Sequence, residues 1–283
     1  MKILVPLDGS ECSECVLPYV RSLGQREGVR ISLLRATDPF FSTPFGLASE
    51  LAEEIRSKLV DTNTDYLARV ERQLSVRQLS SWSAVGKARE EICRVAAEQE
   101  CDLIVMASHG HSGLRRWVLG SVAEGVVRMA PCPVLLIRQP APQSSRFQHI
   151  LVPIDGSPAS LKVHLQLAPY AGRNTRVTLM TATGLTAQDH GEQIARGTLQ
   201  AYMENLEDNL KLVRVAGVEF RVQVLDGEAG SSILGWAGEE GCDLIAMASH
   251  AHTSIRRFFL GSVTQKVLRE ACCSVLIFPV KEP

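Results

Sequence analysis

The chain carries the same series of motifs twice, and this internal repeat limits its fold more than any other feature. The segment at 3–10 reads ILVPLDGS, and the segment at 150–157 reads ILVPIDGS. CDLI recurs at 101–104 and 242–245, and LGSV recurs at 119–122 and 260–263. A period near half of the 283 residues is too long for a solenoid repeat. We therefore predict a duplicated domain, at 1–138 and 147–283, with the Pro-, Ser- and Gln-rich segment 139–146 as linker.

Short apolar runs alternate with helical segments in both halves. In the first half we predict strands at 3–7, 30–36, 76–85, 103–106 and 134–137, and helices at 13–26, 47–74, 88–99 and 122–129. In the second half we predict strands at 150–154, 176–182, 219–225, 244–248 and 275–278, and helices at 161–171, 193–215, 231–240 and from 263. Such alternation predicts an α/β fold whose parallel sheet is covered on both faces.

The stretch at 106–122, MASHGHSGLRRWVLGSV, has the features of an anion-binding loop. It joins a buried strand to the start of a helix, where backbone N–H groups are unpaired and the dipole favours negative charge. Gly110, Gly113 and Gly120 allow the backbone to approach a ligand closely. In parallel sheets ligands bind at the carboxyl ends of the strands. We expect Asp8, Ala36 and this loop, which all follow strands, to meet at one crevice.

Together these motifs resemble those of the universal stress protein family, and the resemblance covers nearly the whole chain as a tandem of two domains. The family's nucleotide motif is G-x2-G-x9-G-[S/T]. The first half has Ala107, Gly110, Gly120 and Ser121 at its four positions, and the second half has Ala248, Ala251, Gly261 and Ser262. The resemblance implies two Rossmann-like (adenine nucleotide alpha hydrolase-like) domains, each a five-stranded parallel sheet of order 3-2-1-4-5 flanked by helices. It also implies that strands 134–137 and 275–278 pair in an intramolecular pseudo-dimer, and it leaves a homodimer open.

The same resemblance implies a regulatory stress-response protein that binds ATP, with or without Mg²⁺. Asp8 would contact the ribose, the backbone at Ala36 the adenine, and the glycine loop with Ser121 the ribose and phosphates. The predicted nucleotide site is Pro6, Leu7, Asp8, Gly9, Ala36, Met106, Ala107, His109, Gly110, His111, Gly113, Arg116, Gly120, Ser121 and Val122. A weaker second site is predicted at Asp155, Ala182, Ala248, Gly261 and Ser262.

Alanines in the motif distinguish the two halves. Ala107 replaces the first glycine, and a backbone with negative φ accepts that change. In the second half Ala251 also replaces the next glycine, which costs about 1 kcal/mol or more if the position needs a positive φ. We therefore expect the nucleotide mainly in the first half, with the second site weak or empty.

Two alternative functions remain open from the residues. A slow ATPase or phosphotransferase is one, but the chain has no P-loop lysine and no evident carboxylate pair for Mg²⁺, so we name no catalytic residues. An interaction module that has lost nucleotide binding in both halves is the other, suggested by Ala107, Ala248 and Ala251.

Composition narrows the class of partner and the compartment. The formal net charge of −1 gives no reason to expect nucleic acid or an anionic membrane as partner. With no signal peptide and no apolar run of membrane-spanning length, we expect a cytoplasmic protein. An H-x-H in each half, at 109–111 and 250–252, lacks a third ligand, so no metal site is predicted.

The cysteines suggest two different roles. Cys101, Cys132, Cys242 and Cys273 stand at matching places in the repeat, which suggests small buried hydrophobes rather than a disulfide framework. The pair at 12 and 15 lies near the first helix start, which can lower a thiol pKa, so a redox or metal role stays open there.

Overall fold

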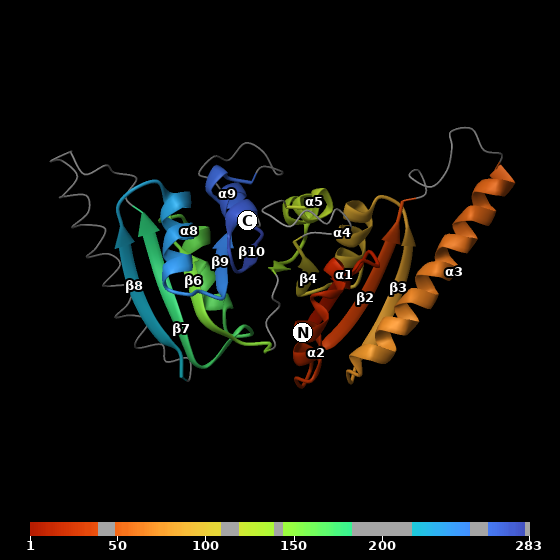
Figure 1. The fold of residues 1–283 in the computed structure, drawn as a ribbon, viewed down its shortest axis with the longest axis horizontal. Coiled ribbons are helices and arrows are strands. Elements are labelled where there is room, and N and C mark those ends of the chain that lie inside the picture. The colour runs from red at the N-terminus through yellow and green to blue at the C-terminus, as the bar shows by residue number, and fades with distance from the viewer. Residues whose placement is uncertain (39–48, 109–118, 139–143, 183–216, 250–259, 281–283) are drawn as a thin grey trace. The chain divides into compact units, whose positions relative to one another are not determined.

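Two units make up the fold, Met1–Ser145 and Arg146–Pro283 (Figure 1). The structure is a computed structural model, and it describes residues 1–38, 49–108, 119–138, 144–182, 217–249 and 260–280. Each unit contains a parallel sheet of five described strands with helices packed on it.

In unit 1 the strands are β1 (Lys2–Pro6), β2 (Arg30–Thr37), β3 (Leu79–Val85), β4 (Leu103–Ala107) and β5 (Val134–Ile137). They lie in the order β3-β2-β1-β4-β5, and their printed pairings are all parallel. β4 is buried along its whole length, as expected for a central strand covered on both faces, and β5 at the end of the unit's strand order is fully buried as well. Because all five strands run the same way, the carboxyl ends of β1, β2 and β4 lie along one edge of the sheet.

Unit 2 repeats this arrangement with β6 (Phe147–Pro153), β7 (Ala171–Ala182), β8 (Glu219–Leu225), β9 (Leu244–Ala248) and β10 (Ser274–Phe278). Its strand order is β8-β7-β6-β9-β10, again with parallel pairs. Counted within each unit, both sheets have the order 3-2-1-4-5, which confirms the predicted α/β fold.

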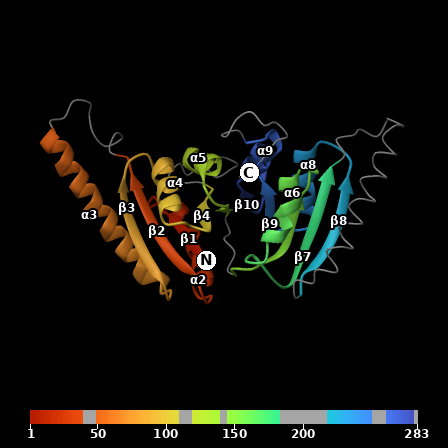
Figure 2. The ribbon, with the colours of Figure 1, turned by 180° about the vertical axis from the view of Figure 1, so that it is seen from behind.

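In unit 1 one or two helices lie between each pair of successive strands, and in unit 2 helices lie in the described connections β6–β7, β8–β9 and β9–β10 (Figures 1 and 2). Unit 1 has α1 (Glu11–Glu14), α2 (Leu17–Gly24), α3 (Ser49–Leu74), α4 (Ala88–Glu98) and α5 (Ser121–Met129). α3 packs against β2, β3 and α2, while α4 packs against α5 and the same two strands. Right-handed crossovers place α1, α2 and α3 on one face of the sheet and α4 and α5 on the other.

Unit 2 has α6 (Pro158–Val163), the 3₁₀-helix η2 (His164–Gln166), α8 (Ala229–Glu239) and α9 (Ser262–Glu270). The predicted helix at 193–215 lies outside the described residues. Within the part of the chain that is described, no helix is both long enough and apolar enough to cross a membrane.

Two predicted helices differ from the structure, and a proline explains each difference. The predicted helix at 13–26 is two helices, α1 and α2, because Pro18 has no N–H to donate to the carbonyl of Glu14. The predicted helix at 161–171 is wrong beyond Gln166, since Pro169 disfavours helical backbone before it and Ala171 already begins β7.

The repeated cysteines belong to the hydrophobic core. Cys101, Cys132, Cys242 and Cys273 are all buried and none of them is in a disulfide, which confirms the prediction of small buried hydrophobes rather than a disulfide framework. Burial raises the pKa of the Cys242 thiol to about 12, so this side chain stays uncharged at neutral pH.

Candidate functional site

A cavity of about 270 Å³ opens at the carboxyl edge of the unit 1 sheet. It is enclosed by the ends of β1, β2 and β4 and by the starts of α1, α4 and α5. Its lining residues are Pro6, Leu7, Asp8, Ser13, Ala36, Ala88, Ile92, Met106, Ala107, Ser108, Gly120, Ser121, Val122 and Ala123. The structure therefore brings the predicted residues of three separate strand ends, and of the α5 start, around one space.

Asp8 is held at the cavity by the turn that follows β1. Its Oδ1 accepts hydrogen bonds from the backbone N–H of Ser10 at 2.9 Å and from the Ser10 hydroxyl at 2.6 Å. The Ser10 Oγ also accepts from the Ser13 N–H at 3.1 Å and so caps α1. Gly9 does not line the cavity; its φ of +88° allows the turn that directs Asp8 there.

The start of α5 forms the opposite wall. Gly120 is the N-cap residue and has no side chain that could accept a hydrogen bond from the first helical amides. Its own N–H donates to the Ser108 carbonyl at 2.9 Å, which fixes the end of β4 against the helix start. The amides of the first turn and the positive end of the helix dipole lie at the cavity wall, and both favour an anion.

Apolar side chains supply most of the remaining surface. Ile92 of α4 and Met106 of β4 are buried, and Ala36 closes the end of β2 beside them. The site thus combines an apolar surface with an acid on one side and helix amides on the other, which is typical of small-molecule pockets.

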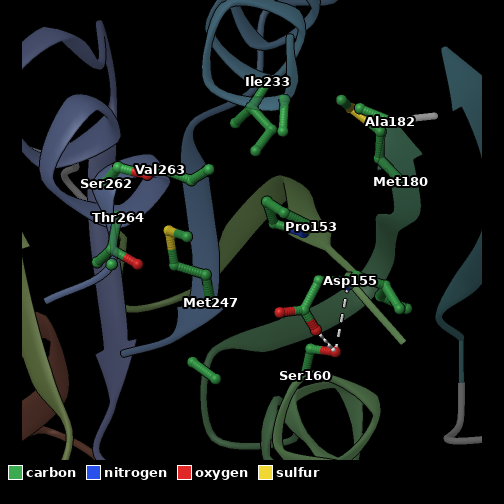
Figure 3. Close-up of a pocket in the computed structure, with 14 residues that line it drawn as sticks. Pro153, Asp155, Ser160, Met180, Ala182, Ile233, Met247, Ser262, Val263 and Thr264 are labelled. Atoms are coloured by element: carbon green, nitrogen blue, oxygen red, sulfur yellow. Dashed lines mark hydrogen bonds between the residues drawn. The ribbon is translucent and has the colours of Figure 1, made fainter. Parts of the chain in front are cut away.

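Unit 2 contains a matching cavity of about 230 Å³ (Figure 3). It is lined by Pro153, Ile154, Asp155, Ser160, Met180, Ala182, Ala229, Ile233, Met247, Ala248, Gly261, Ser262, Val263 and Thr264. Asp155 Oδ1 accepts from the Ser160 hydroxyl at 2.7 Å, as Figure 3 shows, and from the Ser157 N–H at 2.9 Å. The five residues predicted for the second site all line this cavity.

The two linings differ in few side chains. Thr264 stands where unit 1 has Ala123, and its hydroxyl and extra methyl narrow the space next to the helix start. The acid is also held differently, because the side-chain hydroxyl that Asp155 accepts from belongs to the helix residue Ser160 and not to the turn residue Ser157.

Sequence reasoning missed several lining residues that the repeat itself marks. Ser13 and Ser160 both follow the aspartate by five residues, so their recurrence was a usable signal. Pro153, Ile154 and Val263 are the counterparts of Pro6, Leu7 and Val122, which were predicted only in the first half. Ala88 and Ile92, with their counterparts Ala229 and Ile233, come from helices whose contact with the site no local motif indicates.

Some predicted positions lie outside the described residues. These are His109, Gly110, His111, Gly113 and Arg116 in the first half, and Ala251 with both ends of the second H-x-H in the second. Among the residues that are described, no group of three or more His, Cys, Asp or Glu side chains could hold a metal ion.

Cys12 contradicts the idea that the first helix start activates a thiol. Burial, and to a smaller extent the negative charge of Asp8, raise the pKa of Cys12 above its ordinary value. The thiolate that redox chemistry or metal binding needs is therefore disfavoured at this position.

Comparison with known proteins supports one family for both units. The model of the universal stress protein family matches residues 1–138 and again residues 146–279. The universal stress protein Slr1230 of Synechocystis is 26% identical over 98% of this chain and 99% of its own length. The universal stress protein MJ0577 of Methanocaldococcus jannaschii is 29% identical over 49% of this chain and 94% of its own. A universal stress protein structure from Archaeoglobus fulgidus matches with a TM-score of 0.71 and 21% identity over 98% of both chains, which supports the fold.

Proposed function

The chain belongs to the universal stress protein family, and from this premise we propose that it is a regulatory, cytoplasmic protein that binds an adenine nucleotide, ATP, mainly in unit 1. The observation that carries the proposal is the pairing of Asp8 with the uncapped start of α5 across one partly apolar cavity. Each part of this arrangement suits a different part of a nucleotide.

Asp8 suits the ribose. A carboxylate accepts hydrogen bonds from two neighbouring hydroxyls, as acidic residues do in dinucleotide-binding folds. The bonds from Ser10 hold the Asp8 carboxylate in a fixed orientation before any ligand arrives. Little freedom is then lost on binding, which favours affinity.

The α5 start suits the phosphates, and the apolar side chains suit the base. The amides of Ser121, Val122 and Ala123 are the first of the helix, and the N-cap Gly120 offers them no side-chain acceptor. Phosphate oxygens meet such amides favourably. Ala36 and Ile92 contribute apolar side chains to the cavity, against which an adenine ring can pack.

Two features support unit 1 as the main site. Ala123 lines the unit 1 cavity where unit 2 has the larger side chain of Thr264, which leaves more room for a ligand beside the start of α5. The sequence also has Gly110 in the first loop where the second loop has Ala251.

The test is a calorimetric titration of the purified chain with ATP, with and without Mg²⁺. Asp8→Asn removes the negative charge but keeps a side-chain oxygen that can accept the hydrogen bonds from Ser10. A loss of ATP affinity in this variant can therefore be assigned to the carboxylate and not to a disrupted turn. Because hydrogen bonds to charged groups are worth about 1.5–3 kcal/mol, we expect Asp8→Asn to weaken ATP at least about tenfold. The matched variant Asp155→Asn should change the ATP affinity of the unit 1 site by less than about twofold.

Failure of the wild-type chain to bind ATP in this titration would overturn the proposal. So would an unchanged melting temperature at high ATP, since a ligand that binds only the folded state raises it.

A further inference from the structure

The side chain of Arg35 packs against the turn that carries Asp8. Arg35 precedes Ala36 on β2, and because side chains alternate along a strand it points to the α3 face and not into the cavity. Its Cζ lies 4.4 Å from the centroid of the Tyr66 ring. A Cβ placed on Gly9 would lie 3.1 Å from Nη2, 3.3 Å from Cζ and 3.5 Å from Nη1. The planar guanidinium therefore lies next to both the Tyr66 ring and the Gly9 turn.

Tyr66 is itself fixed. The side chain is buried, and its hydroxyl donates to Glu14 Oε1 at 2.9 Å. Arg69 lies over the same ring at 5.2 Å and approaches Glu14 at 3.8 Å. Burial and then the Glu14 hydrogen bond raise the pKa of Tyr66, while the charges of Arg35 and Asp8 act on it in opposite directions. Asp8 thus belongs to the same electrostatic neighbourhood as this cluster of Glu14, Arg35, Tyr66 and Arg69.

Among the described residues, none packs on the equivalent turn of unit 2 in this way. The strand register matches Pro6 with Leu34 and Pro153 with Met180, so Thr181 occupies the position of Arg35. Gly156 has a φ of +81°, close to that of Gly9, but a Cβ there would meet no described atom within 4 Å. Leu161 stands where unit 1 has Glu14. The two Asp-Gly-Ser turns therefore share a similar backbone φ at the glycine and differ in the described side chains that pack on them.

We propose that Arg35 is a positioning residue, which clamps the Gly9 turn against Tyr66 so that Asp8 meets the ribose hydroxyls of the nucleotide, and which makes unit 1 the tighter site. Glycine is the residue with the most backbone freedom, so a turn built on it gains most from an external clamp. Order that exists before binding is not lost on binding, and the affinity rises accordingly. The inference rests on the proposed nucleotide function and assigns its selectivity for ribose to a residue outside the cavity.

The test compares ATP with 2′,3′-dideoxy-ATP, which lacks both ribose hydroxyls, in the full-length chain. Asp155→Asn is present throughout, so that unit 1 dominates the measured affinity. Arg35→Gln should lower the affinity for ATP about fivefold to tenfold, which is the scale of one hydrogen bond. It should lower the affinity for the dideoxy nucleotide by less than about twofold. In an Asp8→Asn background the same change should have no further effect on ATP, because Arg35 acts through Asp8.

Arg69→Gln is the matched control. It removes the same charge from over the same Tyr66 ring, but Arg69 is not among the nearest atoms to Gly9, so the affinity for ATP should stay within about twofold of the parent. Tyr66→Leu removes the other side of the clamp and keeps the Arg35 charge. Tyr66→Leu should likewise lower the affinity for ATP more than the affinity for the dideoxy nucleotide. It replaces Arg35→Gln in the test if that variant does not fold.

The outcomes separate this inference from the proposed function. If the parent binds ATP and Asp8→Asn weakens it, but Arg35→Gln binds ATP like the parent, the positioning role is overturned and the function stands. An equal loss for both nucleotides also overturns it, since that indicates a general structural effect. If the parent binds no ATP, the function fails and the positioning role fails with it.

Discussion

One tripeptide, Asp-Gly-Ser, occurs in both units with nearly the same backbone and different neighbours. Gly9 and Gly156 have φ values of +88° and +81°, a region that other residues enter only with strain. The Arg35 guanidinium lies 3.1–3.5 Å from a Cβ built on Gly9, whereas no described atom lies within 4 Å of a Cβ built on Gly156. Sequence alone predicted both turns, but it could not show that Arg35 lies next to the first, because Arg35 is remote in the chain.

Alanine at these two glycines should therefore have unequal effects. Gly156→Ala introduces backbone strain alone, and we expect it to lower the free energy of unfolding by about 1–2 kcal/mol. Gly9→Ala introduces the same strain and also displaces the Arg35 side chain, so it should lower stability further and weaken ATP binding. Urea unfolding and an ATP titration of both variants measure this, and equal costs in the two variants would contradict the contact between Arg35 and Gly9.

At the scale of elements, most strands and the helices α4 and α5 could be predicted to within one or two residues, whereas β7 begins at Ala171 instead of 176 and two helices were predicted wrongly. β8, β9 and β5 have the predicted bounds, because a short apolar run between turn residues has few alternatives in a covered parallel sheet. Helix ends depend on single backbone bonds. Pro18 interrupts the first helix and Pro169 prevents another from continuing, although the apolar periodicity runs through both places.

The site followed the same division. Residues at strand ends, such as Asp8, Ala36 and Met106, could be predicted because sheet topology alone brings strand ends together. Ile92 of α4 could not, because its place depends on how a helix packs across the sheet and not on a motif.

Two helical glycines, one closely packed and one with open space around it, lead to a separate prediction. A Cβ on Gly24, the last residue of α2, would lie 2.5 Å from Val76 Cγ1, so Gly24→Ala overpacks this contact and should cost about 1–3 kcal/mol. Gly235, inside α8, has open space around its Cβ position, so Gly235→Ala should stabilise the protein by about 0.5–1 kcal/mol. Thermal unfolding of the two variants should show shifts of opposite sign, and two shifts of the same sign would disprove this packing.

At the scale of the whole molecule, we expect the two units to respond differently to acid. His149 is buried at the start of the unit 2 sheet, with Nε2 3.1 Å from Thr178 Oγ1 and the ring edge against Trp236. Unit 1 has Lys2 at the matching position. Burial lowers the pKa of His149 below its ordinary value, and burial also lowers the pKa of His164 in the same unit.

Unit 2 should accordingly lose stability as the pH falls below about 6.5. Above that pH both histidines are neutral in the folded and the unfolded chain, so they add no pH dependence. Below it the unfolded chain takes up protons more readily than the folded chain, and the loss continues until the pH passes the lowered folded pKa values. Hydrogen exchange at pH 7.5 and pH 5.5 should show protection falling more in peptides from 144–182 than in those from 1–38.

The control for this prediction is His149→Gln, which keeps a polar side chain beside Thr178 but cannot take up a proton. Its unit 2 should be less sensitive to pH than the parent, with the remaining sensitivity due to His164. A variant that loses protection as steeply as the parent would show that His149 is not the group responsible.

The helices that begin after Gly120 and Gly261 have no side-chain N-cap, and this has a consequence beyond the affinity for a nucleotide. Neither residue has a side chain that could accept a hydrogen bond from the first amides of its helix. The phosphate that we propose would accept these hydrogen bonds as the side chain of an N-cap serine does, so nucleotide binding would also stabilise the first turn of the helix. Slower amide hydrogen exchange at Ser121 or Ser262 would then report that the nucleotide site of that unit is occupied.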